Sequence, residues 1–273
     1  MMPADDAAFA ALTRKISREA GLTLDAYKDK CLRRRIAVRM RACGVHSFSD
    51  YQTVLDRSPA EYERLKDAIT INVTRFYRNA DTWNLLRAGL LQEVCEGDTG
   101  EVSAWSAGCS SGEEPYTLAI LMADYFDRQG KPERLGGVTV DATDIDRQSL
   151  ERAKAGRYKR EALAEVPGDL AQRYFEHDRD ECQVIERVRS RVMVQALDLN
   201  REPPLRRNYR LILCRNVVIY FERPTQERVF TAFADSLAPG GLLVLGKVET
   251  LFGPTRERFT LLDPRERIYR LNP

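Results

Sequence analysis

Histidine is scarce in this chain, whose 273 residues include only His46 and His177. Histidine is the commonest protein metal ligand and the usual general base near neutral pH. We therefore expect no metal centre and no histidine general base. Sites built from carboxylates remain open.

The sequence also lacks paired cysteines, long apolar runs and a large net charge. Its six cysteines form no Cys-x-x-Cys motif, so we predict reduced, mostly buried thiols and neither a disulfide framework nor a zinc site. No apolar run reaches the length of a membrane span, and the start Met-Met-Pro-Ala-Asp-Asp has no apolar signal core. The expected location is the cytoplasm. A net charge of +2 does not by itself indicate a nucleic-acid partner.

The first part of the chain has the apolar spacing of helices and no strand signal before about residue 101. We predict an all-helical N-terminal domain over residues 1–70. The expected helices cover residues 9–20, 24–43, 47–55 and 60–71, with Ser58 or Pro59 starting the last of them.

Strands and helices alternate in the remainder, which we assign to one domain over residues 71–273. This pattern predicts an α/β fold with a mostly parallel sheet, helices on both faces and a terminal antiparallel hairpin. Residues 156–191 break the alternation and predict a small inserted subdomain. Expected strands are 102–107, 137–142, 192–197, 210–214, 242–245, 259–262 and 268–271; expected helices are 116–126, 147–155 and 225–237.

A small-residue turn with Gly108 and Gly112 joins the first strand to a helix that has Pro115 in its first turn. Glycines let a backbone approach a ligand closely, and a helix N-terminus offers free N–H donors. A plain tight turn is the alternative. The turn lacks the Gly-x-Gly-x-x-Gly fingerprint, which disfavours a nicotinamide oxidoreductase.

Polar side chains follow three further strands, at the sheet edge where open α/β sheets bind ligands. Asp144 can accept hydrogen bonds from a ribose, although Asp144 or Asp146 can instead cap the next helix. Asp198 can accept from an adenine amino group, or it belongs to an ordinary polar loop. Arg215, Asn216 and Tyr220 follow the fourth strand, where a buried connection is the alternative. Upstream, residues 72–79 carry Asn72, Thr74 and Arg78 and could fold over a ligand pocket or form a linker.

Taken in order, these segments resemble the CheR family of chemotaxis receptor methyltransferases, which are protein-glutamate O-methyltransferases. The resemblance covers roughly residues 20–255. It is carried by Ile71-Asn-Val-Thr-Arg-Phe-Tyr-Arg-Asn79, Trp105-Ser-Ala-Gly-Cys-Ser-Ser-Gly-Glu-Glu-Pro-Tyr116, Ala142-Thr-Asp-Ile-Asp146, and Cys214-Arg-Asn-Val-Val-Ile-Tyr-Phe221 followed by Thr225-Gln226.

The resemblance implies a Rossmann-like sheet that binds S-adenosylmethionine (SAM) and releases S-adenosylhomocysteine (SAH). It places Asn72, Thr74 and Arg78 near the methionine end of the cofactor, with Arg78 as the catalytic arginine. It implies that one acid of the Glu113/Glu114 pair binds the cofactor ammonium. Glu113 is the favoured residue, and Glu114 is the alternative. Asp144 matches the ribose acid, and Asp198 and Leu199 match the adenine position, with Asp in place of the family's Asn. Arg215, Asn216 and Tyr220 match the substrate-facing wall, where Arg215 and Tyr220 are expected to be catalytic together with Arg78.

The predicted helix over residues 24–43 is strongly basic. Lys30, Arg34 and Arg41 lie on one flank of its apolar stripe, and Lys28, Arg35 and Arg39 on the other. A solvated surface of a core helix is one interpretation, and nucleic-acid phosphate is a rival. The resemblance favours docking of Arg34, Arg35, Arg39 and Arg41 on glutamate-rich receptor helices.

Two further features bear on the partner. The inserted segment resembles the family's small β-subdomain, which in some members grips a receptor C-terminal pentapeptide, but residues 176–188 look short for that loop. We therefore expect an enzyme that needs no tether. The family's Gly-His-Ser-Glu is Gly246-Lys-Val-Glu249 here, which bears on receptor preference. We expect a monomer that methylates chemoreceptors; a cofactor-binding docking module and an RNA methyltransferase are the alternatives.

Overall fold

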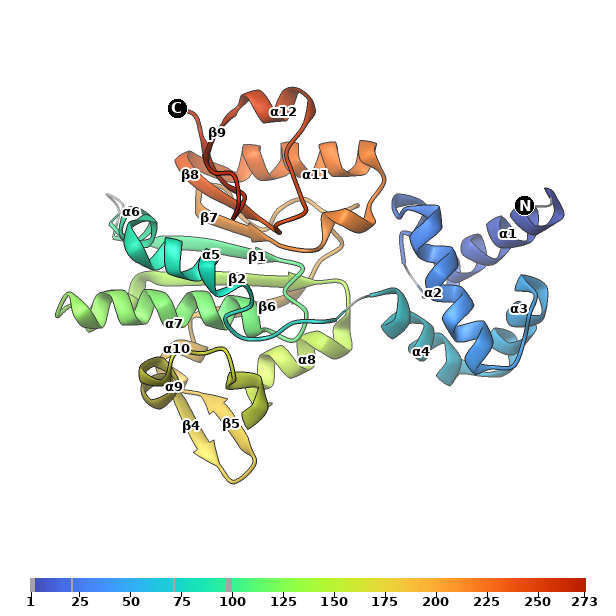
Figure 1. Ribbon diagram of the computed structural model, residues 1–273, viewed down its shortest axis with the longest axis horizontal. Helices are drawn as coiled ribbons and strands as arrows, with labels where there is room; N and C mark the ends of the chain where they lie inside the picture. The colour runs from blue at the N-terminus through green and yellow to red at the C-terminus, as the bar shows by residue number, and fades with distance from the viewer. Residues whose placement is uncertain (1–2, 21, 71, 97–99) are drawn as a thin grey trace. The chain divides into compact units, whose positions relative to one another are not determined.

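The computed structural model describes residues 3–20, 22–70, 72–96 and 100–273, and its chain is drawn in Figure 1. Two compact units are present. One comprises Met1–Asn72 together with Tyr220–Gln226, and the other comprises Val73–Ile219 together with Glu227–Pro273. The expected helix end at Ile71 lies outside the described residues. A short segment from late in the chain thus completes the N-terminal unit.

The first unit is helical, as predicted. Its α-helices are α1 (Pro3–Ala20), α2 (Asp29–Ala42), α3 (Phe48–Arg57) and α4 (Pro59–Ile69). Ser47 caps α3 by accepting from the backbone N–H of Asp50, and Pro59 occupies the first turn of α4, where it removes no hydrogen bond. The apolar faces of these helices meet in a core that includes Leu12, Ile16, Leu32, Ile36, Tyr51 and Leu65.

The expected single helix over residues 24–43 is wrong. A 3₁₀ turn at Leu24–Ala26 is separated from α2 by Tyr27, which forms an antiparallel bridge with Phe221. The backbone N–H of Lys28 donates to the carbonyl of Tyr220 at 2.8 Å, and that of Glu222 to the carbonyl of Ala26 at 2.8 Å. These bonds take the backbone groups that a continuous helix would have used. Their partners lie far along the chain, so local spacing gave no signal of the break.

The larger unit is built on a seven-stranded sheet in the order β6-β2-β1-β7-β8-β10-β9. Strands β6, β2, β1, β7 and β8 are parallel, and β10 pairs antiparallel with both β8 and β9. The predicted α/β fold and terminal hairpin are confirmed. The strands are β1 (Val102–Ala107), β2 (Val138–Asp144), β6 (Val192–Ala196), β7 (Tyr209–Cys214), β8 (Leu237–Leu245), β9 (Phe259–Asp263) and β10 (Ile268–Leu271).

Helices flank both faces of this sheet (Figure 1). In β1, the ring of Trp105 packs 5.3 Å from Phe233 of α11, whereas the next side chain, Ser106, bonds to Glu114 of α7. Neighbouring strand residues point to opposite faces, so α7 and α11 cover opposite sides. The helices of this part are α5 (Ala80–Leu85), α6 (Leu91–Cys95), α7 (Glu113–Arg128), α8 (Arg147–Ala155), α11 (Arg223–Ser236) and α12 (Gly253–Glu257), with a π-helical turn at Leu86–Leu90.

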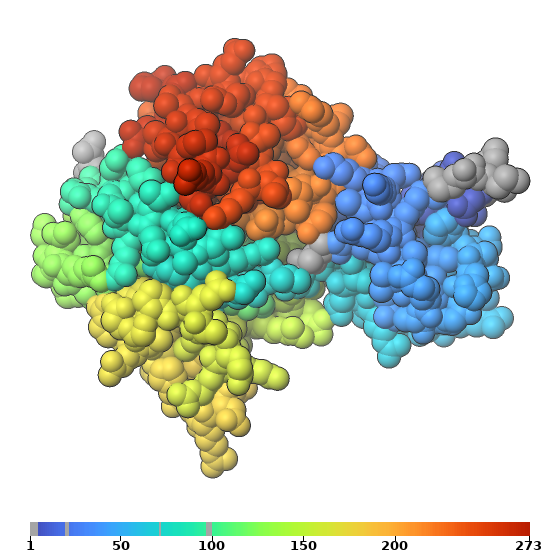
Figure 2. All heavy atoms as spheres, in the orientation of Figure 1, coloured from blue at the N-terminus to red at the C-terminus, as the bar shows by residue number. Residues whose placement is uncertain are grey.

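The segment after α8 forms a second, three-stranded sheet in the order β3-β5-β4. Its strands are antiparallel, and Figure 2 shows the yellow β4–β5 hairpin projecting from the larger unit. The elements of this inserted subdomain are β3 (Arg157–Lys159), α9 (Gly168–Tyr174), β4 (Phe175–Asp178), β5 (Glu181–Val184) and α10 (Glu186–Arg189).

The cysteines behave as predicted: all six are free thiols, and four of them are buried. Within the described residues, no helix is long and apolar enough to cross a bilayer.

Candidate functional site

The strand order reverses between β1 and β7. Strand β2 follows β1 on one side of it, while β7 follows much later on the other side. In open α/β sheets, ligands bind in the crevice outside the carboxyl ends of the strands at such a point. The turn after Ala107 and the turn after Cys214 therefore border one candidate site.

The turn after β1 requires its glycines. Gly108 has a φ of +81°, and a Cβ there would lie 2.4 Å from Cγ2 of Val217 in the turn after β7. Gly112 has a φ of +97°, and a Cβ there would lie 2.9 Å from both the Cβ of Ala153 and the hydroxyl oxygen of Tyr158. Both the backbone conformation and the close approach of neighbouring groups exclude a side chain.

Asp144 holds this turn to the end of β2. Its carboxylate accepts from the backbone N–H of Ser110 at 2.8 Å and from that of Asp146 at 2.9 Å. Asp146, not Asp144, caps α8 by accepting from the backbone N–H of Gln148. Burial raises the pKa of Asp144, although the backbone donors oppose the shift. Asp144 is thus free of the capping role and lies beside the glycine turn.

The two glutamates that begin α7 have different surroundings. Glu113 accepts from the hydroxyl of its neighbour Ser111 at 2.8 and 3.1 Å. Glu114 accepts from the hydroxyl of Ser106 in β1 at 2.9 Å and from Nη1 of Arg215 at 3.3 Å. Burial raises the pKa of each, and for Glu114 the positive charges of Arg215 and Arg78 oppose that shift. Glu114 therefore faces the crevice between β1 and β7.

Arg215 links Glu114 to the segment that carries Arg78. Its Nη2 donates to the carbonyl oxygen of Arg78 at 2.8 Å and to Oδ1 of Asn79 at 3.0 Å. The guanidinium lies 5.2 Å from the ring centre of Trp83, whose Nε1 also donates to the carbonyl of Arg78. The backbone of Arg78 is thus fixed from two sides.

The side chain of Arg78 borders an open cavity of about 360 Å³. Its Nη1 donates to the carbonyl of Val73 at 2.7 Å, while the rest of the guanidinium remains available for a further partner. The cavity is lined by Arg75, Arg78, Asn79, Ala80, Glu165, Asn216, Lys247 and Val248. Arg75 is paired with Glu165, and Lys247 with Glu266 and Asp81, so Arg78 is the cation of this lining that can best meet an anionic guest.

Glu249 organises the turn after β7. Its buried carboxylate accepts from the backbone N–H groups of Asn216 at 2.8 Å and Val217 at 2.9 Å. Two more backbone donors, Gly246 and Ile219, also point to it. Asn216 has a φ of +62°, in the left-handed region that asparagine enters more readily than most other non-glycine residues. A buried acid thus stabilises the unusual backbone of the turn that carries Arg215.

Sequence reasoning assigned no role to Ser106, Asn79, Trp83 or Glu249. The first three act through contacts with Glu114, Arg78 and Arg215 that no local pattern reveals. Glu249 had a signal, since it is the one acid retained in the altered Gly246–Glu249 segment.

Several buried polar atoms near this edge have no hydrogen-bond partner among the residues that the structure describes. They are Oγ of Ser110, Nε of Arg215 and Oδ1 of Asn216. Leaving a buried polar group unpaired costs about 1–3 kcal/mol. Their positions in the turns after β1 and β7 fit a site for a polar ligand.

The remaining expected residues are placed less centrally. Asp198 is buried after β6 and accepts from the backbone N–H of Asn200 at 2.9 Å, with Leu199 half-buried beside it. Asn72 ends the helical unit, whereas Thr74 belongs to the larger unit with Arg78. Tyr220 belongs to the helical unit, where Arg35 lies 5.1 Å from its ring centre.

The four expected docking arginines of α2 divide into two pairs. Arg35 is half-buried and donates to the carbonyls of Ala68 and Ile69. Arg39 makes two bonds, of 2.9 and 2.8 Å, to the buried carboxylate of Glu61. Arg34 and Arg41 are exposed. Only the second pair is free to meet a partner, because the first holds α2 to the rest of the helical unit.

Comparison with known proteins identifies the family to which this chain belongs. Residues 7–70 match the family described as "CheR methyltransferase, all-alpha domain", and residues 72–268 match "CheR methyltransferase, SAM binding domain". The chain is 38% identical to the chemotaxis protein methyltransferase of Klebsiella aerogenes, over 94% of this chain and 87% of that protein. It is 32% identical to that of Escherichia coli, over 94% of this chain and 88% of that protein. The chain therefore belongs to the CheR methyltransferase family, and SAM is the cofactor of its larger unit.

Proposed function

We propose that this protein transfers a methyl group from SAM to glutamate side chains in the cytoplasmic helical region of chemoreceptors. The products are glutamate methyl esters and SAH. The observation that carries the proposal is the placement of Arg78 at an open cavity, where Arg215 holds the Arg78 backbone and Glu114 in turn holds Arg215.

The residues around the β1–β7 crevice fit SAM. Asp144 would accept from the ribose hydroxyls, and Asp198 with Leu199 would border the adenine. Gly108 gives the backbone room. Asn72 and Thr74 are assigned to the methionine end through the family resemblance, which assigns Asn216 to the substrate-facing wall. The unpaired atoms of Ser110 and Asn216 offer further partners for a polar ligand.

Glu114, rather than Glu113, is our candidate for the cofactor ammonium. Glu114 lies at the end of β1, against Ser106, and faces Arg215. Glu113 is bonded to Ser111, and its electrostatic neighbours are Arg152 and Tyr158. Only Glu114 shares the crevice with the segment that carries Arg78.

The chemistry needs alignment more than proton transfer. The bound cofactor supplies an activated methyl group on a sulfonium. A glutamate side chain is already ionised at neutral pH and needs no general base, which agrees with the scarcity of histidine. Arg78 would orient the carboxylate by charge-assisted hydrogen bonds. Arg215 acts as a positioning residue, because its guanidinium already binds Glu114 and the Arg78 backbone. Tyr220 keeps a substrate-facing role by resemblance alone.

The helical unit is the proposed receptor-docking part. Lys30, Arg34 and Arg41 are exposed on one side of α2, and Val38 next to them is 47% exposed. A basic face with an exposed apolar side chain at its edge suits a helix that presents acids beside a hydrophobic stripe. We propose a monomer that acts in the cytoplasm and needs no receptor tether.

The test is transfer of labelled methyl groups from SAM to membranes that carry the chemoreceptors of the same organism. Base-labile label on a receptor would establish a carboxyl methyl ester, and R78A should slow its appearance about 10²–10³-fold while leaving the protein folded. Normal SAH binding by calorimetry without such label would overturn the proposed substrate. In that case RNA would be tried next as acceptor.

A further inference from the structure

Phe76, two residues before Arg78, is enclosed by the inserted subdomain. Its side chain is fully buried, and its ring meets Tyr158 of β3 edge-to-face, with 4.8 Å between centres. On another side it meets Phe175 of β4 at 5.1 Å, again edge-to-face. Such aromatic pairs have a defined geometry, so they restrict where the neighbouring Arg78 can lie.

Tyr158 also contacts the turn after β1, residues 108–112, which we call the cofactor turn. Its hydroxyl donates to the carbonyl of Ser111 at 2.8 Å and lies where a side chain on Gly112 would have to go. Burial raises the pKa of Tyr158 well above its usual value, so the phenol stays protonated and remains a donor. One side chain therefore contacts both the turn after β1 and the segment of Arg78.

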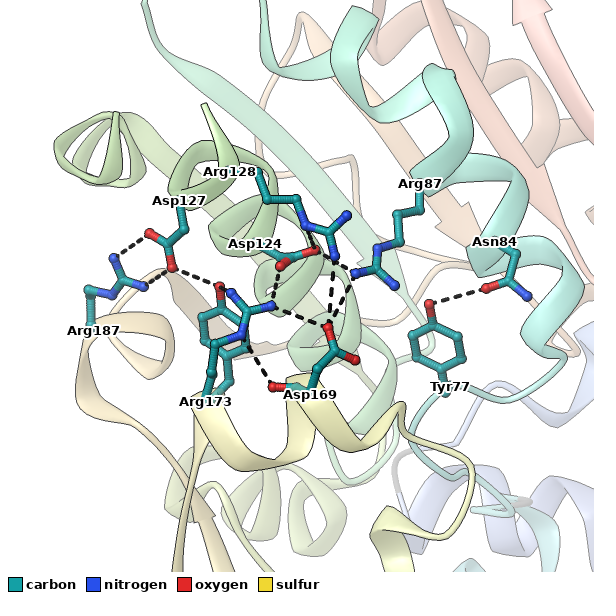
Figure 3. Close-up of polar contacts among 10 residues, drawn as sticks. Tyr77, Asn84, Arg87, Asp124, Asp127, Arg128, Asp169, Arg173 and Arg187 are labelled. Carbon is teal, nitrogen blue, oxygen red and sulfur yellow. Dashed lines mark hydrogen bonds and ion pairs between the residues drawn. The ribbon is translucent and has the colours of Figure 1, made fainter. Parts of the chain in front are cut away.

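The inserted subdomain is itself fastened to α7, as Figure 3 shows. Buried Asp124 of α7 pairs with Arg173 of α9 and with Arg87, which follows α5. Asp127, one turn further along α7, takes two bonds from Arg187 of α10 and one from the hydroxyl of Tyr174. The subdomain is therefore a firm support for Tyr158 and Phe175, because it is tied to the helix that begins at the cofactor turn.

We propose that Tyr158 is a positioning residue through which the inserted subdomain sets both the cofactor turn and the Arg78 segment. Its hydroxyl fixes the Ser111 carbonyl, and its ring, with Phe175, fixes Phe76. The turnover measurement rests on the proposed function, because it needs the proposed methyl acceptor. The SAH-binding measurement does not.

Three substitutions separate the two contacts. Y158F removes only the hydroxyl bond, so SAH affinity should fall about 5-fold, with turnover at saturating SAM nearly unchanged. F76L keeps the hydroxyl bond but loses the ring contacts, so turnover should fall about 10-fold or more, with SAH affinity nearly unchanged. Y158L should show both losses. A general loss of stability would not split the two quantities in this way.

F259L is the matched control for F76L. Phe259 of β9 is equally buried and meets Tyr269 edge-to-face, but it lies on the edge strand of the main sheet. Y125F, near the other end of α7 from the turn after β1, removes a tyrosine hydroxyl that bonds to Glu96 and should leave SAH affinity unchanged. The proposal is overturned if Y158F binds SAH like the parent protein, or if F259L lowers turnover as much as F76L does.

Amide hydrogen exchange gives a readout that does not need a methyl acceptor. Faster exchange is expected at residues 73–79 in F76L and at residues 108–112 in Y158F, and at neither segment in F259L. Should the parent protein methylate no receptor, the proposed function fails. Exchange and SAH affinity would still decide the role of Tyr158, and unchanged exchange at both segments would refute it.

Discussion

The guanidinium of Arg215 and the carboxylate of Glu114 form an ion pair, with 3.3 Å between Nη1 and Oε2, and their side chains are only 3% and 13% exposed. Removing one member of such a pair leaves an uncompensated charge, which is more costly than the pair itself is stabilising. The pair joins the helix after β1 to the turn after β7, the two segments that border the cofactor crevice.

Neutralising Glu114 should weaken cofactor binding more than neutralising Glu113. E114Q leaves Arg215 buried beside a neutral amide and removes the proposed partner of the cofactor ammonium, so SAH affinity should fall at least about 10-fold. E113Q should change affinity by less than about 3-fold. Calorimetry with SAH checks both variants. The reverse order would restore Glu113 as the ammonium partner.

The rate of methyl transfer should depend on both the charge and the planar geometry of the Arg78 guanidinium. R78A is expected to slow methyl transfer about 10²–10³-fold, because a preorganised charge contact with the substrate is lost. R78K keeps the charge but not the fork geometry of the guanidinium, so its rate of methyl transfer should lie between those of R78A and the parent protein. Initial rates at saturating SAM and receptor measure this. Near-normal turnover in R78A would remove Arg78 from the mechanism.

Gly108 should tolerate no side chain. In G108A the new methyl group meets Val217 at 2.4 Å and the residue keeps a φ of +81°, so we expect a loss of about 1–3 kcal/mol in the free energy of unfolding. G130A is the control, because Gly130 has a φ of +67° with nothing within 4 Å of the added Cβ. Denaturant unfolding should show a clearly smaller loss for G130A. Equal losses would mean that backbone strain alone, and not the approach of β1 to β7, requires glycine.

The arginines of α2 should separate into structural and docking residues. R39A leaves the buried carboxylate of Glu61 with only the more distant Arg64, at 3.8 Å, and should cost about 3 kcal/mol of stability. R34A and R41A, at exposed positions, should change stability by less than about 0.5 kcal/mol. Receptor affinity and its salt dependence should nevertheless fall in the latter two. Unchanged affinity in the R34A/R41A double variant would exclude this face as the docking surface.

Asp127 should make stability depend on pH in the acid range. Bonds from Arg187, followed by that from Tyr174, outweigh burial and lower its pKa in the folded protein. The folded state therefore binds the proton less readily than the unfolded chain does. This contribution is fully present above the unfolded pKa of about 3.9 and is lost as pH falls through the lowered folded value. The free energy of unfolding of D127N should be lower than that of the parent protein near neutral pH, and this difference should shrink below about pH 4.

The alternation of strands and helices predicted the fold because it depends on local spacing. β1, α8 and the terminal hairpin end within a residue or so of their expected limits. The break before α2 could not be predicted, since it depends on pairing of Tyr27 with Phe221. Where a backbone group finds its partner in a distant segment, periodicity carries no information.

For the candidate site, the sequence predicted which turns border the site, but it did not predict which side chains bond to each other. Asp144 and Asp146 could each cap α8, and only their hydrogen bonds separate them. Arg35 and Arg39 belong to the same basic run as Arg34 and Arg41, yet their partners are the carbonyl of Ala68 and the carboxylate of Glu61. Such choices depend on burial and on side-chain direction, which a composition of charges does not specify.

The return of Tyr220–Gln226 to the helical unit has a consequence for synthesis on the ribosome. Domains usually fold in order from the N-terminus as they emerge. Here the helical unit acquires its last segment only after nearly all parallel strands of the larger unit have been made. Until then Tyr27 and Lys28 lack the backbone partners they have in the finished protein. The helical unit, although translated first, is therefore complete only once Gln226 has been made, and a nascent chain halted before residue 220 would carry it unfinished.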